Sequence, residues 1–217
     1  MRKRAEERKN EILDTADRLF ALKGYDNTST NDILEMVGIA RGALYHHFKS
    51  KEEIMDSLIE RYISRVLEAA KTAAAERSLP AKERIIQTIM ALNIQRAGGT
   101  EIIRQAHRPQ NALMHEKMQR AMINGLTPIL AEIVREGIEQ GIFHTAFPYE
   151  CMEMMVIYIN TVFDRDIASL TAAEKDTRMR ALLSNMGKLL GAETGSLMDV
   201  AEVFGRQINT DYKEGKE

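Results

Sequence analysis

The sequence predicts an all-α protein with a short N-terminal unit of three helices followed by a larger set of helices. Of its 217 residues, 44% are hydrophobic and 29% charged, and only four are proline. This composition is typical of a helical protein with a sizeable core. Apolar residues recur every three or four positions, which is the spacing of one helix face. Between Thr28 and Lys51 two short helical patterns meet at a glycine, as in a helix-turn-helix.

The first predicted helix ends near Lys23, just before Gly24. Its apolar stripe can cover the two short helices that follow, and comprises Ile12, Leu13, Ala16, Leu19 and Phe20. The chain before this stripe is basic, with Arg2, Lys3, Arg4, Arg8 and Lys9 interrupted by two glutamates. Two interpretations stay open for this basic start: a solvated, frayed helix end, or a contact with phosphates or the minor groove of a nucleic acid.

The next two predicted helices are short. Ser29 and Asp32 have the spacing of a capping box, and Gly38 supplies the positive φ that lets the chain reverse. The second of them is predicted from 41 to 48, with Leu44 and Phe48 on its buried side and arginine, tyrosine and histidine on the other. Such an exposed face favours a DNA-binding helix-turn-helix. The predicted core of the unit is Ile12, Ala16, Leu19, Phe20, Ile33, Val37, Leu44 and Phe48.

Longer helices are predicted beyond this unit. A rigid connector, capped by Ser50 and Glu53, starts at Lys51, and Pro128 is expected in the first turn of a later helix. Residues 151–163 are apolar at nearly every position, so their helix must be covered on all sides, and we expect a second copy of the chain to cover one of them. Helices are predicted from 51 to about 77, from 85 to about 98, near 102–103, across 113–122, from 128 to about 141, from 148 to 163, and across 182–190 and 200–204.

Residues 12–54, with the sequence ILDTADRLFALKGYDNTSTNDILEMVGIARGALYHHFKSKEEI, resemble the N-terminal DNA-binding domain of the tetracycline-repressor (TetR) family. The matching pieces are LF and KGY in the first helix, TST before the second, GI in the turn, and LYHHFKSKEE after it. Each piece alone is weak, but together they are specific. The chain departs from the family pattern at Leu34 and Val37, where small alanines are usual, and at Ala40, where a serine often caps the helix.

The resemblance implies a set of DNA contacts on the helix-turn-helix. Arg41 matches a guanine-reading position, and Gly42 and Ala43 match positions that approach thymine methyls. Thr30 and Asn31, which begin the second helix, can reach phosphate or a base edge. The matches to phosphate-binding positions are Tyr45, His47 and Lys51, and His46 can contact either phosphate or a base. Packing within the small domain is the alternative for Tyr45 and one histidine. The implied contacts are Thr30, Asn31, Arg41, Gly42, Ala43, Tyr45, His46, His47 and Lys51.

The resemblance also implies the division of labour along the chain. Residues 1–52 would form the DNA-binding domain, and residues 53–217 a helical domain that binds an effector and dimerises. Helices near 149–169 and 175–190 would pair with their symmetry mates in a four-helix interface.

Charge and cysteine content bear on the expected binding partners and on the cellular compartment of the protein. The net charge of −2 gives no support to nucleic-acid binding, although residues 1–51 carry ten Lys and Arg against eight Asp and Glu. The lone Cys151 excludes an internal disulfide and fits a reducing compartment. Because no signal peptide and no apolar run of about 18 residues is present, we expect a cytoplasmic protein.

Methionines are concentrated in the C-terminal part, where ten of the thirteen lie from Met90 onward. Flexible, polarisable methionines can line a pocket for apolar ligands, and they can equally fill an ordinary core. Polar groups among the same helices, including Asn160, could orient a ligand or be satisfied elsewhere. The candidate ligand-binding residues are Met90, Asn93, His107, Met114, Met118, Met122, Met155 and Tyr158.

No catalytic or metal-binding pattern stands out. The sequence has no P-loop, nucleophile elbow or paired-carboxylate site. His46 and His47 point about 100° apart on a helix, with no carboxylate or thiol at ligand spacing. Cys151 lies in the apolar helix and is expected to be a core residue. We therefore expect no cofactor, no metal and no enzymatic activity.

These observations predict a dimeric, sequence-specific transcriptional regulator, foremost a repressor that binds a palindromic operator and is released by a small apolar effector. Two alternatives stay open: a ligand-independent architectural DNA-binding protein, and a transcriptional activator. A helical enzyme with an incidental helix-turn-helix is a third, for which the sequence offers no catalytic constellation.

Overall fold

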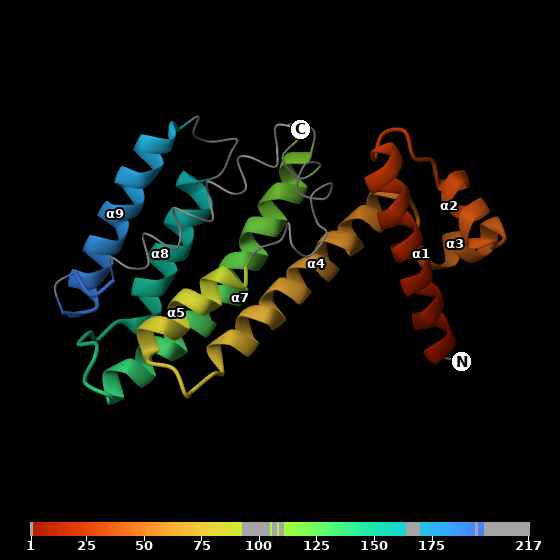
Figure 1. Cartoon of the computed structure of the whole chain (residues 1–217). Helices are drawn as coiled ribbons and strands as arrows, with labels where there is room; N and C mark the ends of the chain where they lie inside the picture. The colour runs from red at the N-terminus through yellow and green to blue at the C-terminus, as the bar shows by residue number, and fades with distance from the viewer. Residues whose placement is uncertain are drawn as a thin grey trace. The chain divides into compact units, whose positions relative to one another are not determined.

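The structure is a computed structural model that describes residues 2–92, 105, 108, 111–163, 170–193 and 195–197. Its regular elements within these ranges are α-helices (Figure 1), which confirms the predicted all-α class. They are α1 Arg2–Lys23, α2 Thr30–Val37, α3 Arg41–His47, α4 Lys51–Ala74, α5 Ala81–Met90, α7 Ala112–Glu139, α8 Pro148–Val162 and α9 Ala172–Leu189. None of the helices in this part of the chain has the length and hydropathy that crossing a membrane requires.

The chain divides into two compact units. The first comprises Met1–Arg65 and Ile94–Met118, and the second comprises Val66–Asn93 and Gln119–Glu217. Helices α4 and α7 therefore each contribute to both units. The functional boundary predicted after residue 52 is a different division, and it stays a prediction.

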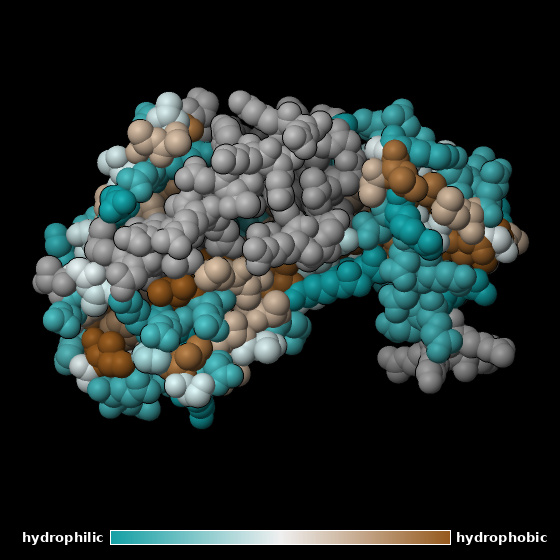
Figure 2. Space-filling model, in the orientation of Figure 1, coloured by the Kyte–Doolittle hydropathy of each residue, from teal (hydrophilic) through white to brown (hydrophobic). Residues whose placement is uncertain are grey.

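The first unit is built on the apolar stripe of α1. All but one of the predicted core residues are at most 2% exposed, the exception being the half-buried Val37. Ile54, Met55 and Leu58 of α4 close this core with no exposed area. Burying one such side chain contributes about 1.5–3 kcal/mol, so helices as short as α2 and α3 are held by packing and not by their own propensity. Toward its N-terminus, the surface of α1 is hydrophilic (Figure 2).

Polar contacts fix α4 against α1 within this unit. The Tyr62 hydroxyl donates a hydrogen bond of 2.6 Å to Asp17, and Arg61 forms an ion pair of 2.6 Å with Asp14. Burial, followed by the bond to the Asp17 carboxylate, raises the pKa of Tyr62 to about 12. The phenol therefore stays neutral at any physiological pH and acts as a hydrogen-bond donor.

In the second unit α5, α7, α8 and α9 lie side by side around a common apolar core (Figure 1). Phe143 and Leu130 are at its centre, and Cys151 is buried there as a free thiol, which confirms its predicted place in the core. The start of α9 is set by a capping box between Thr171 and Glu174, a pair that sequence reasoning did not single out although it has the same spacing as Ser29 and Asp32.

Arg84 forms the main polar contact inside the second unit. Its side chain is buried, and it donates hydrogen bonds to the carbonyl of Ala74, the last residue of α4. It also forms an ion pair with Glu136 of α7, and Arg77 approaches the same carboxylate at 3.2 Å. Arg84 thus satisfies the end of α4 and joins it to α7.

Two helix predictions need comment. The prediction that Pro128 begins a helix is wrong, because α7 continues through it from Ala112 to Glu139. Proline inside a helix costs about 3 kcal/mol, but Leu126 and Leu130 are buried on either side of it, and this packing outweighs the cost. The last predicted helix, 200–204, lies outside the described residues.

Candidate nucleic-acid interface

The start of α2 is fixed by the predicted capping box. The Ser29 hydroxyl accepts the Asp32 N–H at 3.1 Å, and the Asp32 carboxylate accepts the Ser29 N–H at 2.7 Å. Lys23 from the end of α1 pairs with the same carboxylate at 2.8 Å. Hydrogen bonds from Lys23 and then Ser29 hold the pKa of Asp32 well below its usual range. Thr30 and Asn31 are thereby placed in the first turn of α2, Asn31 being exposed.

The turn between α2 and α3 uses the predicted glycine. Gly38 has a φ of 72° and donates its N–H to the Leu34 carbonyl at 2.9 Å. Ala40 then stands at the N-cap of α3 and makes no side-chain capping bond, as expected from the missing serine. The first N–H groups of α3 therefore receive no bond from an N-cap side chain, although the Ala43 N–H donates to the Ala40 carbonyl at 2.9 Å.

Helix α3 is anchored by one side and free on the other. Leu44 and the C-cap residue Phe48 are buried, while Arg41, Gly42 and Ala43 are exposed. A Cβ built on Gly42 would meet no atom within 4 Å. The outer side of this helix therefore has room for a groove of DNA to approach its backbone.

Three of the predicted contact residues meet across the two helices. The Arg41 guanidinium lies over the Tyr45 ring, with its carbon 5.6 Å from the ring centroid. Hydrogen bonds with Arg41 and then with Thr30 lower the pKa of the Tyr45 phenol. Tyr45 is 42% exposed, so it is a surface residue and not part of the small core.

The two histidines lie beside the basic start of α1. Their ring centroids are 5.3 Å apart. Burial lowers the pKa of the half-buried His47, and the nearby charges of His46, Lys9 and Arg8 lower it further. Lys9 also lies over the Phe48 ring at 5.7 Å. Sequence reasoning left the role of the basic start open. In the structure Lys9 lies near the end of α3 and forms a positive region with it, while Arg8 is paired with Glu11 at 2.6 Å.

Lys51 has partners inside the unit. Its ammonium donates to the carbonyls of Tyr25 at 2.8 Å and Thr28 at 2.9 Å, and it lies 4.2 Å from the centroid of the Tyr25 ring. It thus fastens the loop between α1 and α2 to the start of α4. The predicted phosphate contact of Lys51 stays a prediction beside this structural role.

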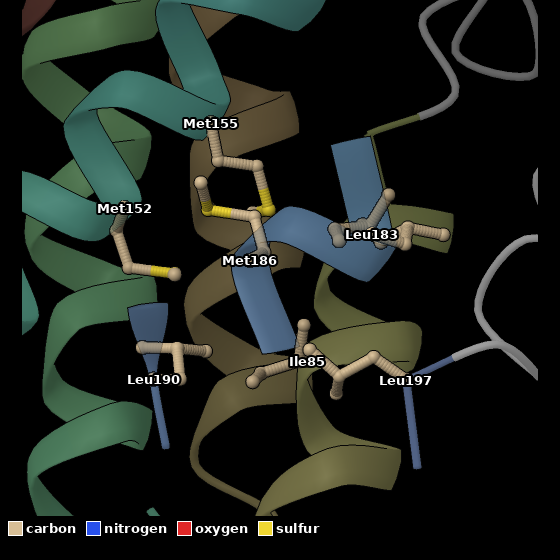
Figure 3. A pocket seen from close by; sticks show the side chains of 8 residues that line it. Ile85, Met152, Met155, Leu183, Met186, Leu190 and Leu197 are labelled. Carbon is tan, nitrogen blue, oxygen red and sulfur yellow. The ribbon is translucent and has the colours of Figure 1, made fainter. Parts of the chain in front are cut away.

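A small apolar cavity lies in the second unit among α5, α8 and α9 (Figure 3). The side chains that line it are all at most 6% exposed and carry no charged or hydrogen-bonding group. The space has room for about one water molecule, so a larger ligand must displace the flexible methionines. The lining residues are Ile85, Ile89, Met152, Met155, Leu183, Met186, Leu190 and Leu197.

Of the predicted ligand-binding residues, this cavity includes Met155. Met122 is buried elsewhere in the core of this unit, Tyr158 packs against Phe163, and Met90 is 42% exposed. Met118 is half-buried and belongs to the first unit. Asn93, His107 and the side chain of Met114 lie outside the described residues. Their ligand-binding roles stay predictions.

Sequence reasoning missed most of the cavity, although a signal was present. Ile85 and Ile89 are four residues apart, Met152 and Met155 three, and Met186 and Leu190 four. Each spacing marks a single helix face, but spacing within one helix does not say which faces meet. No group of three or more histidine, cysteine or acidic side chains that could hold a metal ion lies in the described ranges.

Apolar side chains remain exposed on α8. Met154 is 48% and Ile157 43% exposed, and with Glu150 and Thr161 they form a single exposed stripe along the helix. The prediction that the apolar helix lacks cover on one face agrees with this exposure.

Two family profiles match the chain. The one described as bacterial regulatory proteins, tetR family, matches residues 12–58, and the one described as the tetracyclin repressor-like C-terminal domain matches residues 95–182. The first therefore covers the helix-turn-helix, and the second covers α7, α8 and the first part of α9.

Curated relatives and solved structures agree with these profiles. The HTH-type transcriptional repressor KstR2 of Rhodococcus jostii is 43% identical over 56 residues, which are 26% of this chain and 28% of that protein. The chain thus spans less than a third of that relative. The fatty acid metabolism regulator protein of Bacillus subtilis is 29% identical over 133 residues, 60% of this chain and 68% of that protein.

In fold, the chain is similar to a TetR-family transcriptional regulator from Pectobacterium atrosepticum. The TM-score is 0.57 at 21% identity, over 86% of this chain and 97% of the other. A TetR-family regulator from Syntrophomonas wolfei gives a TM-score of 0.56 at 18% identity, over 94% and 95% of the two chains. Profiles for both the N-terminal and the C-terminal part thus lead to one conclusion: the chain belongs to the TetR family of bacterial regulatory proteins.

Proposed function

We propose that this protein is a transcriptional repressor that binds a palindromic DNA operator as a homodimer and releases it when a small apolar effector binds. The observation that carries the proposal is the outer side of α3, where Arg41, Gly42, Ala43 and Tyr45 are exposed together while Leu44 fixes the helix from behind. A short helix that is held rigidly and presents arginine beside a glycine suits insertion into a major groove.

The contacts divide by chemistry. Arg41 reads a guanine, and Gly42 and Ala43 approach thymine methyls. Thr30 and Asn31 contact phosphate or a base edge, and Tyr45, His46, His47 and Lys51 hold the phosphates. The positive region around Lys9 adds to the phosphate contacts. This division is supported by the exposed position of α3 and by the family to which the chain belongs.

Dimerisation uses α8 and α9, which overlap the predicted ranges 149–169 and 175–190. Its support is the exposed pair of Met154 and Ile157, an arrangement that costs solubility unless another surface covers it. Two copies related by a twofold axis can cover this stripe with the same stripe. The two reading helices then face half-sites about one helical turn apart or more.

The effector binds among the helices of the second unit. The wholly apolar lining of the cavity beside Met155 favours an uncharged hydrocarbon ligand. One relative is named a fatty acid metabolism regulator, and the alkyl chain of a fatty acid, though not its charged carboxylate, matches this apolar lining. An effector that binds the DNA-free arrangement more tightly lowers operator affinity by that difference in binding energy.

The test is selection of random duplex DNA by the purified protein, followed by affinity measurements at several salt concentrations. We expect a palindrome that is bound by dimers far more tightly than scrambled DNA. Recovery of no common sequence, or salt-sensitive binding that is equal for all DNA, would overturn the operator claim and favour an architectural protein.

The selected duplex then serves in an effector screen. Fatty acids, alcohols and uncharged aromatic compounds are added, and operator release and melting temperature are measured. We expect at least one class to release the operator and raise the melting temperature of the DNA-free protein. If none does either, the ligand-independent alternative is favoured. Whether the bound protein represses or activates follows from a reporter gene placed behind the selected operator.

A further inference from the structure

Gln105, Arg108 and residues 111–118 belong to the same unit as the DNA-binding helices. Ile94–Met118 belongs to the first unit together with Met1–Arg65, although the sequence assigns it to the effector domain. Gln105 in this segment has no exposed area. Helix α7 begins in the same segment at Ala112 and continues into the second unit. Helix α7 therefore has its first residues, up to Met118, in the first unit and the rest in the second.

Arg108 connects this segment to the loop between α1 and α2. Its guanidinium forms an ion pair with the carboxylate of Asp26, and its side chain is only 25% exposed. The Arg108 N–H donates to the Gln105 carbonyl at 3.1 Å, and the Asn111 N–H donates to the Arg108 carbonyl at 2.8 Å. Asn111 directly precedes α7. Because Asn111 is hydrogen-bonded to Arg108, a displacement of the start of that helix also displaces Arg108.

The loop that carries Asp26 is tightly built. The Thr28 hydroxyl donates to the Gly24 carbonyl at 2.9 Å, and the Lys51 ammonium holds the carbonyls of Tyr25 and Thr28. Because the loop runs straight into the capping box of α2, a displacement of Asp26 is passed to the first turn of α2. That turn carries Thr30 and Asn31, two of the proposed DNA contacts.

A second ion pair joins the same two regions. Lys117, in the second turn of α7, approaches Asp56 in α4 at 3.5 Å. Asp56 lies five residues after Lys51, which fastens the Asp26 loop. Arg108, just before α7, and Lys117, within it, therefore contact the N-terminal part of the first unit at two separate places.

We propose that the segment leading into α7 regulates operator binding through Arg108. The Arg108–Asp26 ion pair holds the loop between α1 and α2, and with it the first turn of α2, in the arrangement that binds DNA. Movement of α7 that separates the pair lowers operator affinity. This inference rests on the proposed function, because the regulated quantity is the affinity for the operator.

The expected size follows from the exposure of the pair. A partly exposed ion pair of this kind changes an equilibrium about two- to fivefold. Coupling is reciprocal, so an operator that favours the joined arrangement must also stabilise the pair. The link can therefore be tested with DNA alone, before any effector is known.

The test is a charge-swap cycle on the full chain with the selected operator duplex as the probe. Arg108→Asp and Asp26→Arg are measured singly and together, and circular dichroism melting confirms that each variant folds. We expect the single variants to differ from the wild type by about two- to fivefold after correction for charge, and the double variant to recover by the same factor. Arg135→Asp corrects for charge, because it breaks an exposed pair with Glu132 within α7.

Hydrogen exchange gives an independent readout. In the wild type, operator binding should slow exchange of the Asn111 amide, and in Arg108→Asp it should not. The inference would be overturned if the effects of the two charge swaps on operator affinity simply added in the double variant. It would also be overturned if operator binding left the exchange rate of the Asn111 amide unchanged. Failure of the wild type to select any operator would instead overturn the proposed function.

Discussion

The Arg41 guanidinium lies 5.6 Å from the centroid of the Tyr45 ring, one turn along α3. The arginine proposed to read a base is thus steadied by the tyrosine proposed to hold a phosphate, and a hydrogen bond between the two lowers the pKa of the phenol. Recognition and positioning are coupled on one helix face, and substitutions there should report on both.

Replacing Arg41 by alanine should cost about 1–3 kcal/mol of binding at one base pair of the operator, because a bidentate contact with guanine is lost. Affinities for operators changed one base pair at a time would locate that position. In the same variant the pKa of the Tyr45 phenol should rise toward its ordinary value of 10.0, which an absorbance titration measures. An equal loss for every DNA sequence would mean that Arg41 binds phosphate.

Gly38 and Gly42 form a matched pair for separating folding from DNA contact. A Cβ would meet no atom within 4 Å at either position, but Gly38 alone of the two has a positive φ. Gly38→Ala should therefore destabilise the protein by about 1 kcal/mol. Gly42→Ala should keep or raise stability, since alanine favours a helix, and should lower operator affinity about tenfold by blocking the close approach. Denaturant unfolding and DNA titration of both variants check this, and unchanged DNA binding by Gly42→Ala would contradict a close approach.

Operator affinity should rise as the pH falls below about 6.5, the ordinary pKa of imidazole. Burial and neighbouring positive charges keep the pKa of His47 below its ordinary value, so this histidine is largely neutral at pH 7, and protonation adds a charge that attracts phosphate. Affinities between about pH 5 and pH 8 at constant ionic strength measure the effect. The double variant His46→Gln/His47→Gln should flatten the profile, whereas His144→Gln in the second unit should leave it unchanged. If the double variant keeps the pH dependence of operator affinity, that dependence belongs to groups other than the two histidines.

Arg84→Met should destabilise the protein by about 3 kcal/mol, because it leaves Glu136 without its main partner and the Ala74 carbonyl without a donor. Arg77→Met removes a 77% exposed partner of the same carboxylate and should cost less than about 1 kcal/mol. The Arg84 guanidinium holds the pKa of Glu136 below its ordinary value of 4.5. This contribution is therefore present above pH 4.5 and lost as the pH falls through the lower folded-state value. Denaturant unfolding at pH 7 and pH 4 tests both points, and equal costs for the two variants would contradict the assignment.

The sequence determined the features that depend on neighbours three or four residues apart. The capping box of Ser29 and Asp32, the turn at Gly38 and the buried side of α3 through Leu44 all follow from such local spacing. Local hydrogen bonds and a positive φ require particular residue types, so the presence of these residue types predicts the local structure.

Contacts between distant parts of the chain were decided only by the tertiary structure. Lys51 meets the Tyr25 carbonyl 26 residues away, Arg84 meets Glu136 52 residues away, and Arg108 meets Asp26 82 residues away. Spacing along one helix cannot say which face of another helix it meets, so the cavity beside Met155 could not be located from sequence either. Pro128 is a local signal for a helix start, yet burial of the residues around it keeps α7 continuous, because packing energy outweighs the intrinsic preference of a single residue.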